Sequence, residues 1–176
     1  AAAPNPAHIA LAQLEQQGYL KAVITQNIDM LHARAGTQCV YELHGHMREA
    51  TCIQCFRVYP AEPIMLQFIE DHQVPHCPHC DGVLKPNVVL FGEQLPFDAF
   101  QAARVAARSA DLLLMLGSSL EVAPANELPK LALGCGAQLV IINLDETHLD
   151  AAAQVVLHAD VAEALPQIVQ CLEEAA

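Results

Sequence analysis

Four of the seven cysteines stand in two C-x-x-C pairs, which are Cys52 with Cys55 and Cys77 with Cys80. Four thiolates in two such pairs form the tetrahedral soft-ligand set that zinc prefers, and they leave no position open for water. The spacing therefore predicts a structural zinc site, and two pairs in tandem argue against the alternative of a redox-active pair. A complete four-cysteine set leaves the flanking His76 and His79 no role at the metal, so we expect both to be exposed.

A structural zinc ion places the chemistry elsewhere, and His44 is the strongest candidate for it. This residue lies in the polar stretch 41–46, which leads into the first cysteine pair. The unperturbed pKa of histidine lies close to neutrality, so a histidine held between two elements is a natural general base. The alternative is a structural histidine whose ring is satisfied by a backbone carbonyl, and the residue by itself leaves both interpretations open.

The composition limits the classes of partner. A net charge of −12 with only eight lysines and arginines argues against nucleic acid, and a basic partner is easier to accept. Although 53% of the residues are hydrophobic, no apolar run reaches the length that a membrane span requires, so we expect no membrane partner. A chain of 176 residues fits one domain, or one large domain with a small insert.

Cysteine usage favours metal binding over disulfides, and therefore a reducing compartment and a cytoplasmic protein. The other three cysteines, Cys39, Cys135 and Cys171, stand in apolar contexts, and we expect each to be a small buried side chain. The N-terminal residues resemble neither a signal peptide nor a transit sequence and include no initiator methionine. We therefore expect the chain to begin partway through a longer protein.

Apolar patterning predicts alternating helices and strands. Asn5 and Pro6 are typical of a helix start, and Gly18 closes this helix. The short apolar run 20–24 is expected to be a buried parallel strand. Further strands are expected at 86–91, 111–116 and 138–142, and further helices at 30–34, 97–108, 124–133 and 161–172. This alternation predicts an α/β fold with a doubly wound parallel, Rossmann-like sheet at 1–51 and 81–176 and a zinc-binding module at 52–80.

Three of the predicted strands end in polar residues. These endings are Thr25-Gln26-Asn27, Gly117-Ser118-Ser119 and Asn143-Leu144-Asp145. In doubly wound sheets, ligands bind beyond the carboxyl ends of the strands, where small residues allow close approach and an acidic group can hold ribose hydroxyls. The endings together predict a nucleotide site, although each one alone is equally typical of a loop that caps the next helix.

Several ordered motifs together resemble the sirtuin family of NAD-dependent protein lysine deacylases. They are Thr25–His32 (TQNIDMLH), Glu42–Gly45 (ELHG), the two cysteine pairs, Lys85–Glu93 (KPNVVLFGE) and Gly117–Leu120 (GSSL). The match continues through Ile142-Asn143 and Asp160-Val161, so it covers nearly the whole chain. The spacer between the cysteine pairs and the Phe-Gly-Glu-x-Leu-Pro segment look most like bacterial and archaeal members.

The resemblance implies a cofactor site for NAD, which this family consumes as a co-substrate. His44 would be the general base that acts on a hydroxyl of the nicotinamide ribose. The residues implied for NAD are Gln26, Asn27, Ile28 and Asp29 at the nicotinamide end, Gly117, Ser118 and Ser119 at the phosphate and ribose portion, and Asn143, Leu144, Asp145 and Val161 at the adenosine end.

The resemblance also implies an acyl-lysine peptide or protein as substrate. Val89 and Phe91 would line the acyl-lysine tunnel, and the Val89 carbonyl would receive the lysine amide N–H. Segments 92–94, with Gly92 and Glu93, and 121–123, with Glu121 and Val122, would hold the peptide by strand addition. The implied products are free lysine, nicotinamide and O-acyl-ADP-ribose, so the protein supplies positioning groups and one base.

One family feature is not found in these 176 residues. Sirtuins begin with a Gly-Ala-Gly-x-Ser phosphate loop and a cofactor loop bearing Pro-x-Phe-Arg, and the sequence contains neither. We expect a longer natural protein, since the retained residues look fit for catalysis; the alternative is a truncated form with impaired NAD binding. Two other functions stay open, which are protein ADP-ribosyl transfer in the same pocket and a catalytically silent NAD- or zinc-binding interaction module.

Overall fold

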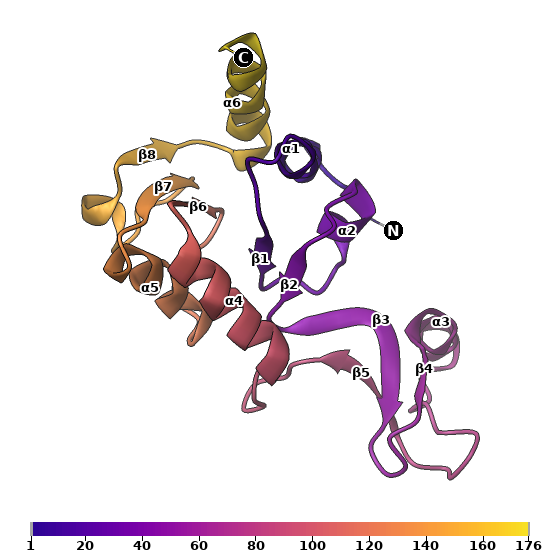
Figure 1. Cartoon of the computed structure of the whole chain (residues 1–176). Helices are drawn as coiled ribbons and strands as arrows, with labels where there is room; N and C mark the ends of the chain where they lie inside the picture. Colours follow the sequence, from indigo (N-terminus) through magenta and orange to yellow (C-terminus); the bar gives the residue numbers. More distant parts are fainter. Residues whose placement is uncertain (1, 176) are drawn as a thin grey trace. The chain divides into compact units, whose positions relative to one another are not determined.

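The computed structural model describes residues 2–175 and divides into two compact units (Figure 1). Unit 1 comprises Ala1–Thr25, Leu31–Tyr41 and Phe97–Ala176, and unit 2 comprises Gln26–Met30 and Glu42–Pro96. The predicted zinc-binding module at 52–80 lies wholly within unit 2, which extends beyond it on both sides.

The centre of unit 1 is a parallel three-stranded sheet of order β6-β7-β8. Its strands are β6 (Leu112–Leu116), β7 (Gln138–Asn143) and β8 (Val155–His158). Side chains of β7 alternate between two apolar clusters, with Leu139 and Ile141 in one and Ile142 in the other. Burial on both faces is typical of the central strands of parallel sheets and explains why β7 is an apolar run from Leu139 to Ile142. The predicted α/β fold with a parallel sheet is confirmed.

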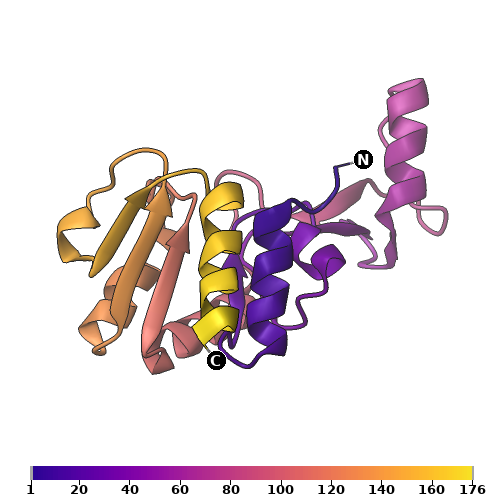
Figure 2. The ribbon, with the colours of Figure 1, turned by 90° about the horizontal axis from the view of Figure 1, so that it is seen from above.

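Helices pack on the parallel sheet of unit 1. Helices α1 (Pro6–Gln16) and α6 (Val161–Ala175) lie side by side and pack their apolar faces against Ile142 (Figure 2). Helix α4 (Phe97–Ser109) packs with α5 (Leu128–Gly134), which follows the 3-10 turn η1 (Ala125–Glu127). A second 3-10 turn, η2 (Asp150–Ala152), precedes β8. The predicted Asn5 cap is confirmed, because its side-chain Oδ1 accepts the His8 N–H at 3.1 Å.

A second small sheet in unit 1 differs from the sequence-based expectation. It consists of β1 (Val23–Thr25) and β2 (Val40–Glu42), and a short helix α2 (Leu31–Ala35) lies between them in sequence, as expected. The strand predicted at 20–24 is therefore wrong in its boundaries. The reason is local, since the Leu20 N–H donates to the Leu14 carbonyl at 3.1 Å and prolongs the end of α1.

Unit 2 is built on an antiparallel sheet of order β4-β3-β5. Its elements are β3 (Gly45–Cys52), β4 (Val58–Pro60), helix α3 (Ala61–Asp71) and β5 (Leu84–Val88). The strand predicted at 86–91 as part of the parallel sheet is wrong, because β5 pairs antiparallel with β3 and ends at Val88. The last apolar residues of the predicted strand, Leu90 and Phe91, lie beyond β5 and are exposed.

The burial of isolated cysteines and histidines tests two further predictions. Cys135 and Cys171 are exposed and Cys39 is only half-buried, so the expectation of three buried cysteines is wrong. Cys135 follows the end of α5, and Cys171 is an exposed residue of α6 between exposed Gln170 and Leu172. His76 and His79 are exposed, as predicted. No helix among residues 2–175 is both long and apolar enough to cross a membrane.

Candidate functional site

His44 is held in a two-residue turn between β2 and β3, next to the fully buried Leu43. Its ring Nδ1 lies 3.1 Å from the carbonyl oxygen of Gln26. A carbonyl can only accept, so Nδ1 must carry the proton in this contact, and the neutral ring presents its lone pair on Nε2. The carbonyl contact of a structural histidine is therefore present, and it also selects the tautomer that a general base needs.

The backbone of the same residue is fixed to β5. The Val89 N–H donates to the His44 carbonyl at 2.8 Å, and Gly45 pairs with Val88. Gly45 has φ +74°, and a Cβ added there would lie 2.0 Å from the Asn87 carbonyl oxygen. Only glycine permits this conformation and this approach at once. The predicted base and the predicted acyl-lysine residue Val89 are thus joined directly.

Replacing Gly45 by alanine is expected to lower the free energy of unfolding by at least about 2 kcal/mol, because left-handed backbone strain adds to the clash with Asn87. Denaturant unfolding followed by circular dichroism measures this change. Gly134→Ala is the matched control, since Gly134 ends α5 and a Cβ added there would meet no atom within 4 Å. Equal midpoints for the two variants would contradict the argument.

The predicted nicotinamide loop, 26–29, lies beside His44 in unit 2. Besides the Gln26 contact, the Met47 N–H of β3 donates to the Ile28 carbonyl at 3.3 Å. These two bonds fix the backbone on either side of Asn27, whose side chain is exposed, as is that of Asp29. The structure therefore brings the predicted base into contact with Gln26 of this loop and attaches Ile28 to the strand that follows His44.

The loop that follows Val89 is closed by a carboxylate. Glu93 Oε2 accepts from the Leu90 N–H and from Lys85 Nζ, each at 2.9 Å, and Lys85 also donates to the Val88 carbonyl at 2.8 Å. The Leu90 N–H and then the Lys85 ammonium lower the pKa of Glu93. Gly92 turns the chain with φ +88°, and Phe91 is left 106% exposed. Glu93, predicted to contact substrate, thus uses its carboxylate to shape the loop.

The remaining predicted NAD residues gather at the carboxyl ends of β6 and β7 in unit 1. The Gly117 N–H donates to the Ile142 carbonyl at 3.0 Å, and a Cβ on Gly117 would lie 3.8 Å from Val161. Asn143 is buried and donates to the Asp145 carbonyl at 2.8 Å, so its amide shapes its own loop. The side chains that remain exposed at these strand ends are Ser119, Leu144 and Asp145.

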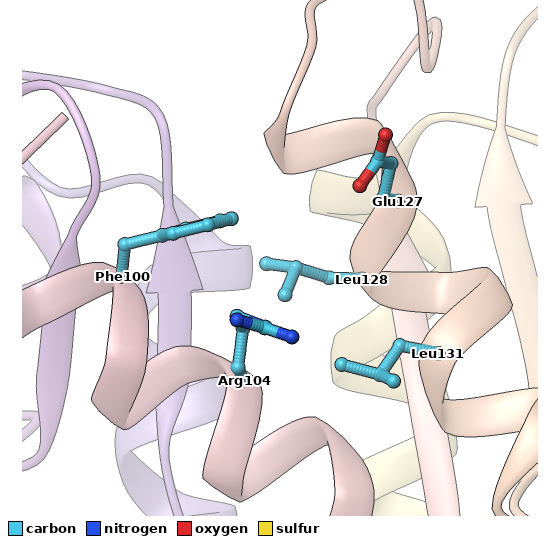
Figure 3. Close-up of a pocket in the computed structure, with 5 residues that line it drawn as sticks. All are labelled: Phe100, Arg104, Glu127, Leu128 and Leu131. Carbon is cyan, nitrogen blue, oxygen red and sulfur yellow. The ribbon is translucent and has the colours of Figure 1, made fainter. Parts of the chain in front are cut away.

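Unit 1 also holds the other predicted substrate residues and one separate cavity. Ser118 Oγ accepts the Leu120 N–H at 3.3 Å, and the predicted substrate residues Glu121 and Val122 are both exposed. A cavity of about 290 Å³ lies between α4 and α5, lined by Phe100, Arg104, Glu127, Leu128 and Leu131 (Figure 3). These five side chains include no predicted site residue, so the cavity is separate from the predicted chemistry.

The four cysteines of unit 2 converge as the sequence predicted, with their Sγ atoms all within 4.8 Å of one another. Sγ atoms of Cys52 and Cys80 are 3.5 Å apart, and those of Cys55 and Cys77 are 3.7 Å apart. A tetrahedron with zinc–sulfur bonds of about 2.3 Å has edges of about 3.8 Å, so the cluster has the size that zinc requires. Cys52 and Cys77 are buried and the other two half-buried.

Neighbouring hydrogen-bond donors favour the thiolate of Cys77. Burial would raise the pKa of Cys77, but hydrogen bonds from the Tyr59 hydroxyl and from the His79 and Cys80 N–H groups lower it to about 6. Tyr59 donates to Cys77 Sγ at 3.1 Å, and this bond raises the pKa of Tyr59 to about 12. Hydrogen bonds to ligand atoms hold them in place and tune the metal.

Replacing Tyr59 by phenylalanine is expected to weaken zinc binding about 10-fold, because Cys77 loses a donor that stabilises its thiolate. Competition with a chromophoric chelator measures the zinc affinity. The matched control is Tyr19→Phe, which removes the hydroxyl of an exposed tyrosine in unit 1. Unchanged affinity in the Tyr59 variant would show that the hydroxyl does not support the metal.

Several contributing residues were not predicted. Tyr59 and Lys85 act through partners 18 and eight positions away in the sequence, and no local pattern marks such contacts. Arg48 and Glu42 form an ion pair across the His44 turn. Glu42 belongs to the ELHG motif, so a search for an opposite charge on the next strand would have found this pair.

The chain is similar to known proteins over most of its length. The Sir2 family model matches residues 1–124. The NAD-dependent protein deacetylase of Thermotoga maritima is 46% identical over 162 residues, which are 92% of this chain and 65% of that protein. The corresponding deacetylase of Haloarcula marismortui is 48% identical over 169 residues, which are 96% and 65%. A solved structure described as Sir2 with a p53 peptide and NAD+ has a TM-score of 0.93 and 43% identity, covering 98% of this chain and 72% of that one.

A parallel sheet covered on both faces, together with a four-cysteine cluster in a smaller unit, defines a Rossmann-like α/β protein with a small four-cysteine module. Within that class, the chain belongs to the Sir2 family, of bacterial and archaeal type. The family predicted from the sequence is thereby confirmed. The chain spans 65% of the length of the two relatives described above.

Proposed function

We propose that the protein is an NAD-dependent protein lysine deacylase that transfers an acyl group to ADP-ribose and releases nicotinamide. The observation that carries this proposal is the pair of hydrogen bonds at His44, whose ring binds Gln26 and whose carbonyl binds the Val89 N–H. One residue thereby joins the loop expected to hold nicotinamide to the segment after β5 that is expected to hold acyl-lysine. The family supports the proposal, since the two relatives are named NAD-dependent protein deacetylases.

His44 is the proposed general base. Its Nδ1–H is directed at the Gln26 carbonyl, so Nε2 is the atom that takes a proton from a ribose hydroxyl. Removal of that proton makes the hydroxyl a nucleophile toward the acyl group. The acyl acceptor itself, ADP-ribose, is supplied by NAD.

Each unit by itself contributes polar groups to the proposed set of NAD contacts. Residues 26–29 contribute exposed amide and carboxylate groups in Asn27 and Asp29, and Gly117 leaves the backbone at the end of β6 open. Ser119 and Asp145 offer exposed polar groups at the strand ends, the usual place for ribose and phosphate in a parallel sheet. The full proposed set also includes Gln26, Ile28, Ser118, Asn143, Leu144 and Val161.

The proposed substrate is an acyl-lysine in a peptide or protein. We propose neither a nucleic acid nor a membrane as a partner. The Val89 N–H donates to the His44 carbonyl. The Val89 carbonyl is the group proposed to accept the N–H of the acylated lysine. The exposed Phe91 and the turn at Gly92 would contact the acyl-lysine and the peptide backbone. Glu121 and Val122 are the proposed contacts from unit 1, and Glu93 contributes through the shape of its loop.

The zinc ion is proposed to be structural, with Cys52, Cys55, Cys77 and Cys80 as ligands and residues 52–80 as its module. The support is the size of the sulfur cluster and the completeness of the ligand set, which leaves no position for a reacting water. The rest of the chain, 1–51 and 81–176, is the proposed NAD-binding part. We also propose a cytoplasmic location, because none of the seven cysteines, all within the described residues, forms a disulfide, as in a reducing compartment.

Mass spectrometry of an acetyl-lysine peptide incubated with the intact protein tests the proposal. Loss of the acetyl group only in the presence of NAD, with formation of O-acetyl-ADP-ribose, is the expected result. Gain of ADP-ribose on the peptide or protein would replace it by protein ADP-ribosyl transfer. An unchanged peptide in a folded, zinc-containing protein would favour a catalytically silent binding module.

A further inference from the structure

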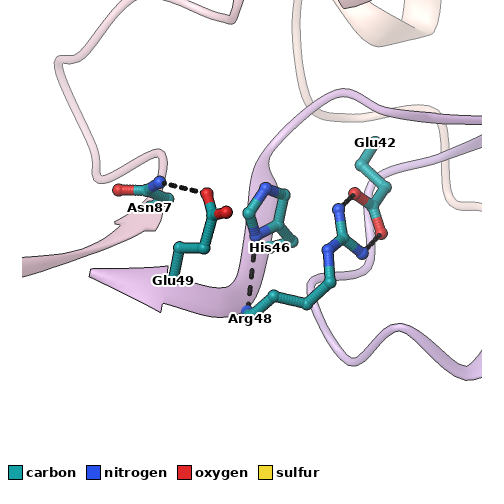
Figure 4. A network of polar contacts seen from close by, with 5 residues as sticks. All are labelled: Glu42, His46, Arg48, Glu49 and Asn87. Carbon is teal, nitrogen blue, oxygen red and sulfur yellow. Dashed lines mark hydrogen bonds and ion pairs between the residues drawn. The ribbon is translucent and has the colours of Figure 1, made fainter. Parts of the chain in front are cut away.

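An ion pair closes the turn that carries His44. Arg48 Nη1 lies 2.8 Å from Glu42 Oε1, and Nη2 lies 2.5 Å from Oε2 (Figure 4). Glu42 is the last residue of β2 and Arg48 lies in β3, so the pair crosses the turn of Leu43 and His44. Two parallel hydrogen bonds between guanidinium and carboxylate fix direction as well as distance.

The two partners are unequally buried, so loss of the pair is expected to cost more free energy than loss of an exposed surface ion pair. The Glu42 side chain is only 11% exposed, whereas that of Arg48 is 45% exposed. A carboxylate largely removed from water needs a charged partner, so removal of Arg48 would leave Glu42 uncompensated. An exposed pair, in contrast, contributes little and has little influence on its surroundings.

A local irregularity of β3 places Arg48 where it can reach Glu42. The pairing of β3 with β5 shifts register between Gly45 and Ala50, and Pro86 in β5 lacks the N–H that a regular ladder would use. In this stretch the Arg48 N–H donates to His46 Nδ1 at 3.3 Å, and Asn87 Nδ2 donates to Glu49 at 3.2 Å. The irregular stretch is therefore held on both sides of Arg48.

We propose that Arg48 is a positioning residue for His44. Its two-point ion pair with Glu42 holds the turn so that His44 Nδ1 stays on the Gln26 carbonyl and Nε2 stays free to accept a proton. Arg48 touches neither substrate nor NAD in this proposal and acts only through His44. Its effect on catalysis rests on the proposed deacylase function, whereas its effect on the ring of His44 does not.

Nitrogen-15 NMR of the histidine rings tests the effect on His44 directly. In histidine-labelled protein, the His44 signals are assigned by their absence in His44→Ala, and at pH 8.5 the wild type is expected to show one tautomer with Nε2 unprotonated. Arg48→Met is expected to give a mixture of tautomers. Arg48→Lys, which keeps the charge but cannot form the two-point pair, is expected to fall between them.

Controls separate this role from general stability. Arg57→Met removes an exposed arginine of the same unit and is expected to leave the His44 signals unchanged. If Arg48→Met does not fold, Glu42→Gln keeps the size of the side chain and weakens the pair from the other side, with the same direction of change. A single unchanged tautomer in the folded Arg48→Met or Glu42→Gln variant would overturn the proposal.

Kinetics give the second readout. Arg48→Met is expected to lower kcat for deacetylation about 10-fold, because displacement of a catalytic group by a fraction of an ångström has effects of this order. The KM values for peptide and NAD are expected to stay within about 2-fold, since no binding group is removed. A change in KM alone would overturn the proposal. The NMR measurement needs neither NAD nor peptide, so failure of the deacylase proposal remains distinguishable from failure of this one.

Discussion

Replacement of His44 by alanine is expected to lower the rate of NAD-dependent deacetylation by about 10²–10⁴-fold while the protein stays folded. The variant removes the Nε2 acceptor, so the ribose hydroxyl keeps its proton. It also removes the ring contact with Gln26, but the Val89 N–H still donates to the backbone carbonyl at position 44. The turn therefore retains its main attachment to β5.

The measurement is the initial rate of acetyl loss from a lysine peptide at saturating NAD. His148→Ala is the control, because it removes an exposed histidine of unit 1 and is expected to keep the wild-type rate. Circular dichroism and zinc content verify that both variants fold. A His44 variant that keeps a rate within about 3-fold of the wild type would remove this residue from the role of general base, for which the expected loss is far larger.

The convergence of the four paired cysteines could be predicted from the sequence because their positions obey a local rule. Two C-x-x-C pairs each form a turn that directs two sulfurs to one point, so type and spacing were sufficient for Cys52, Cys55, Cys77 and Cys80. The apolar strands β6 and β7 could also be predicted from the sequence, since burial on both faces requires uninterrupted apolar runs. Their short neighbour β8 was not predicted, because its four residues are mostly exposed.

Long-range contacts explain most of what the sequence left undecided. The tautomer of His44 depends on a carbonyl 18 positions earlier, and any residue type at position 26 would provide that carbonyl. The role of Glu93 was predicted from its motif, yet its carboxylate is occupied by Lys85 and the Leu90 N–H. The motif was therefore sufficient to locate the loop. Which of its side chains can contact substrate and which hold the loop in shape depends on backbone geometry.

The predicted burial of isolated cysteines failed for a different reason. Apolar neighbours in sequence say little about which side of a helix faces the core, and Cys171 lies on the exposed side of α6 although Leu165 and Val169 of the same helix are buried. The helical period of 3.6 residues decides this, and position 171 falls off the stripe formed by 165 and 169. A periodicity analysis of 161–175 would have corrected the expectation.

Loss of a zinc ligand is expected to have the largest effect on stability. Cys52→Ala should lower the free energy of unfolding of unit 2 by more than about 4 kcal/mol, since loss of a metal is among the few changes of that size. Cys52 is fully buried and its Sγ accepts the Gln54 N–H at 3.4 Å, so no water can replace it easily. Zinc content by elemental analysis and thermal unfolding measure the outcome.

Cys135→Ala is the matched control, because it removes an exposed thiol of unit 1 and is expected to change stability by less than about 0.5 kcal/mol. Full zinc content and an unchanged unfolding temperature in Cys52→Ala would refute the metal site.

The zinc ion should also affect activity without taking part in the reaction. Cys52 ends β3, Gly45 begins it, and both pair with β5, so a sheet loosened at the metal would loosen the turn that holds His44. Chelation is therefore expected to slow deacetylation in parallel with unfolding of unit 2, whereas the His44→Ala variant should lose activity with its zinc and fold intact.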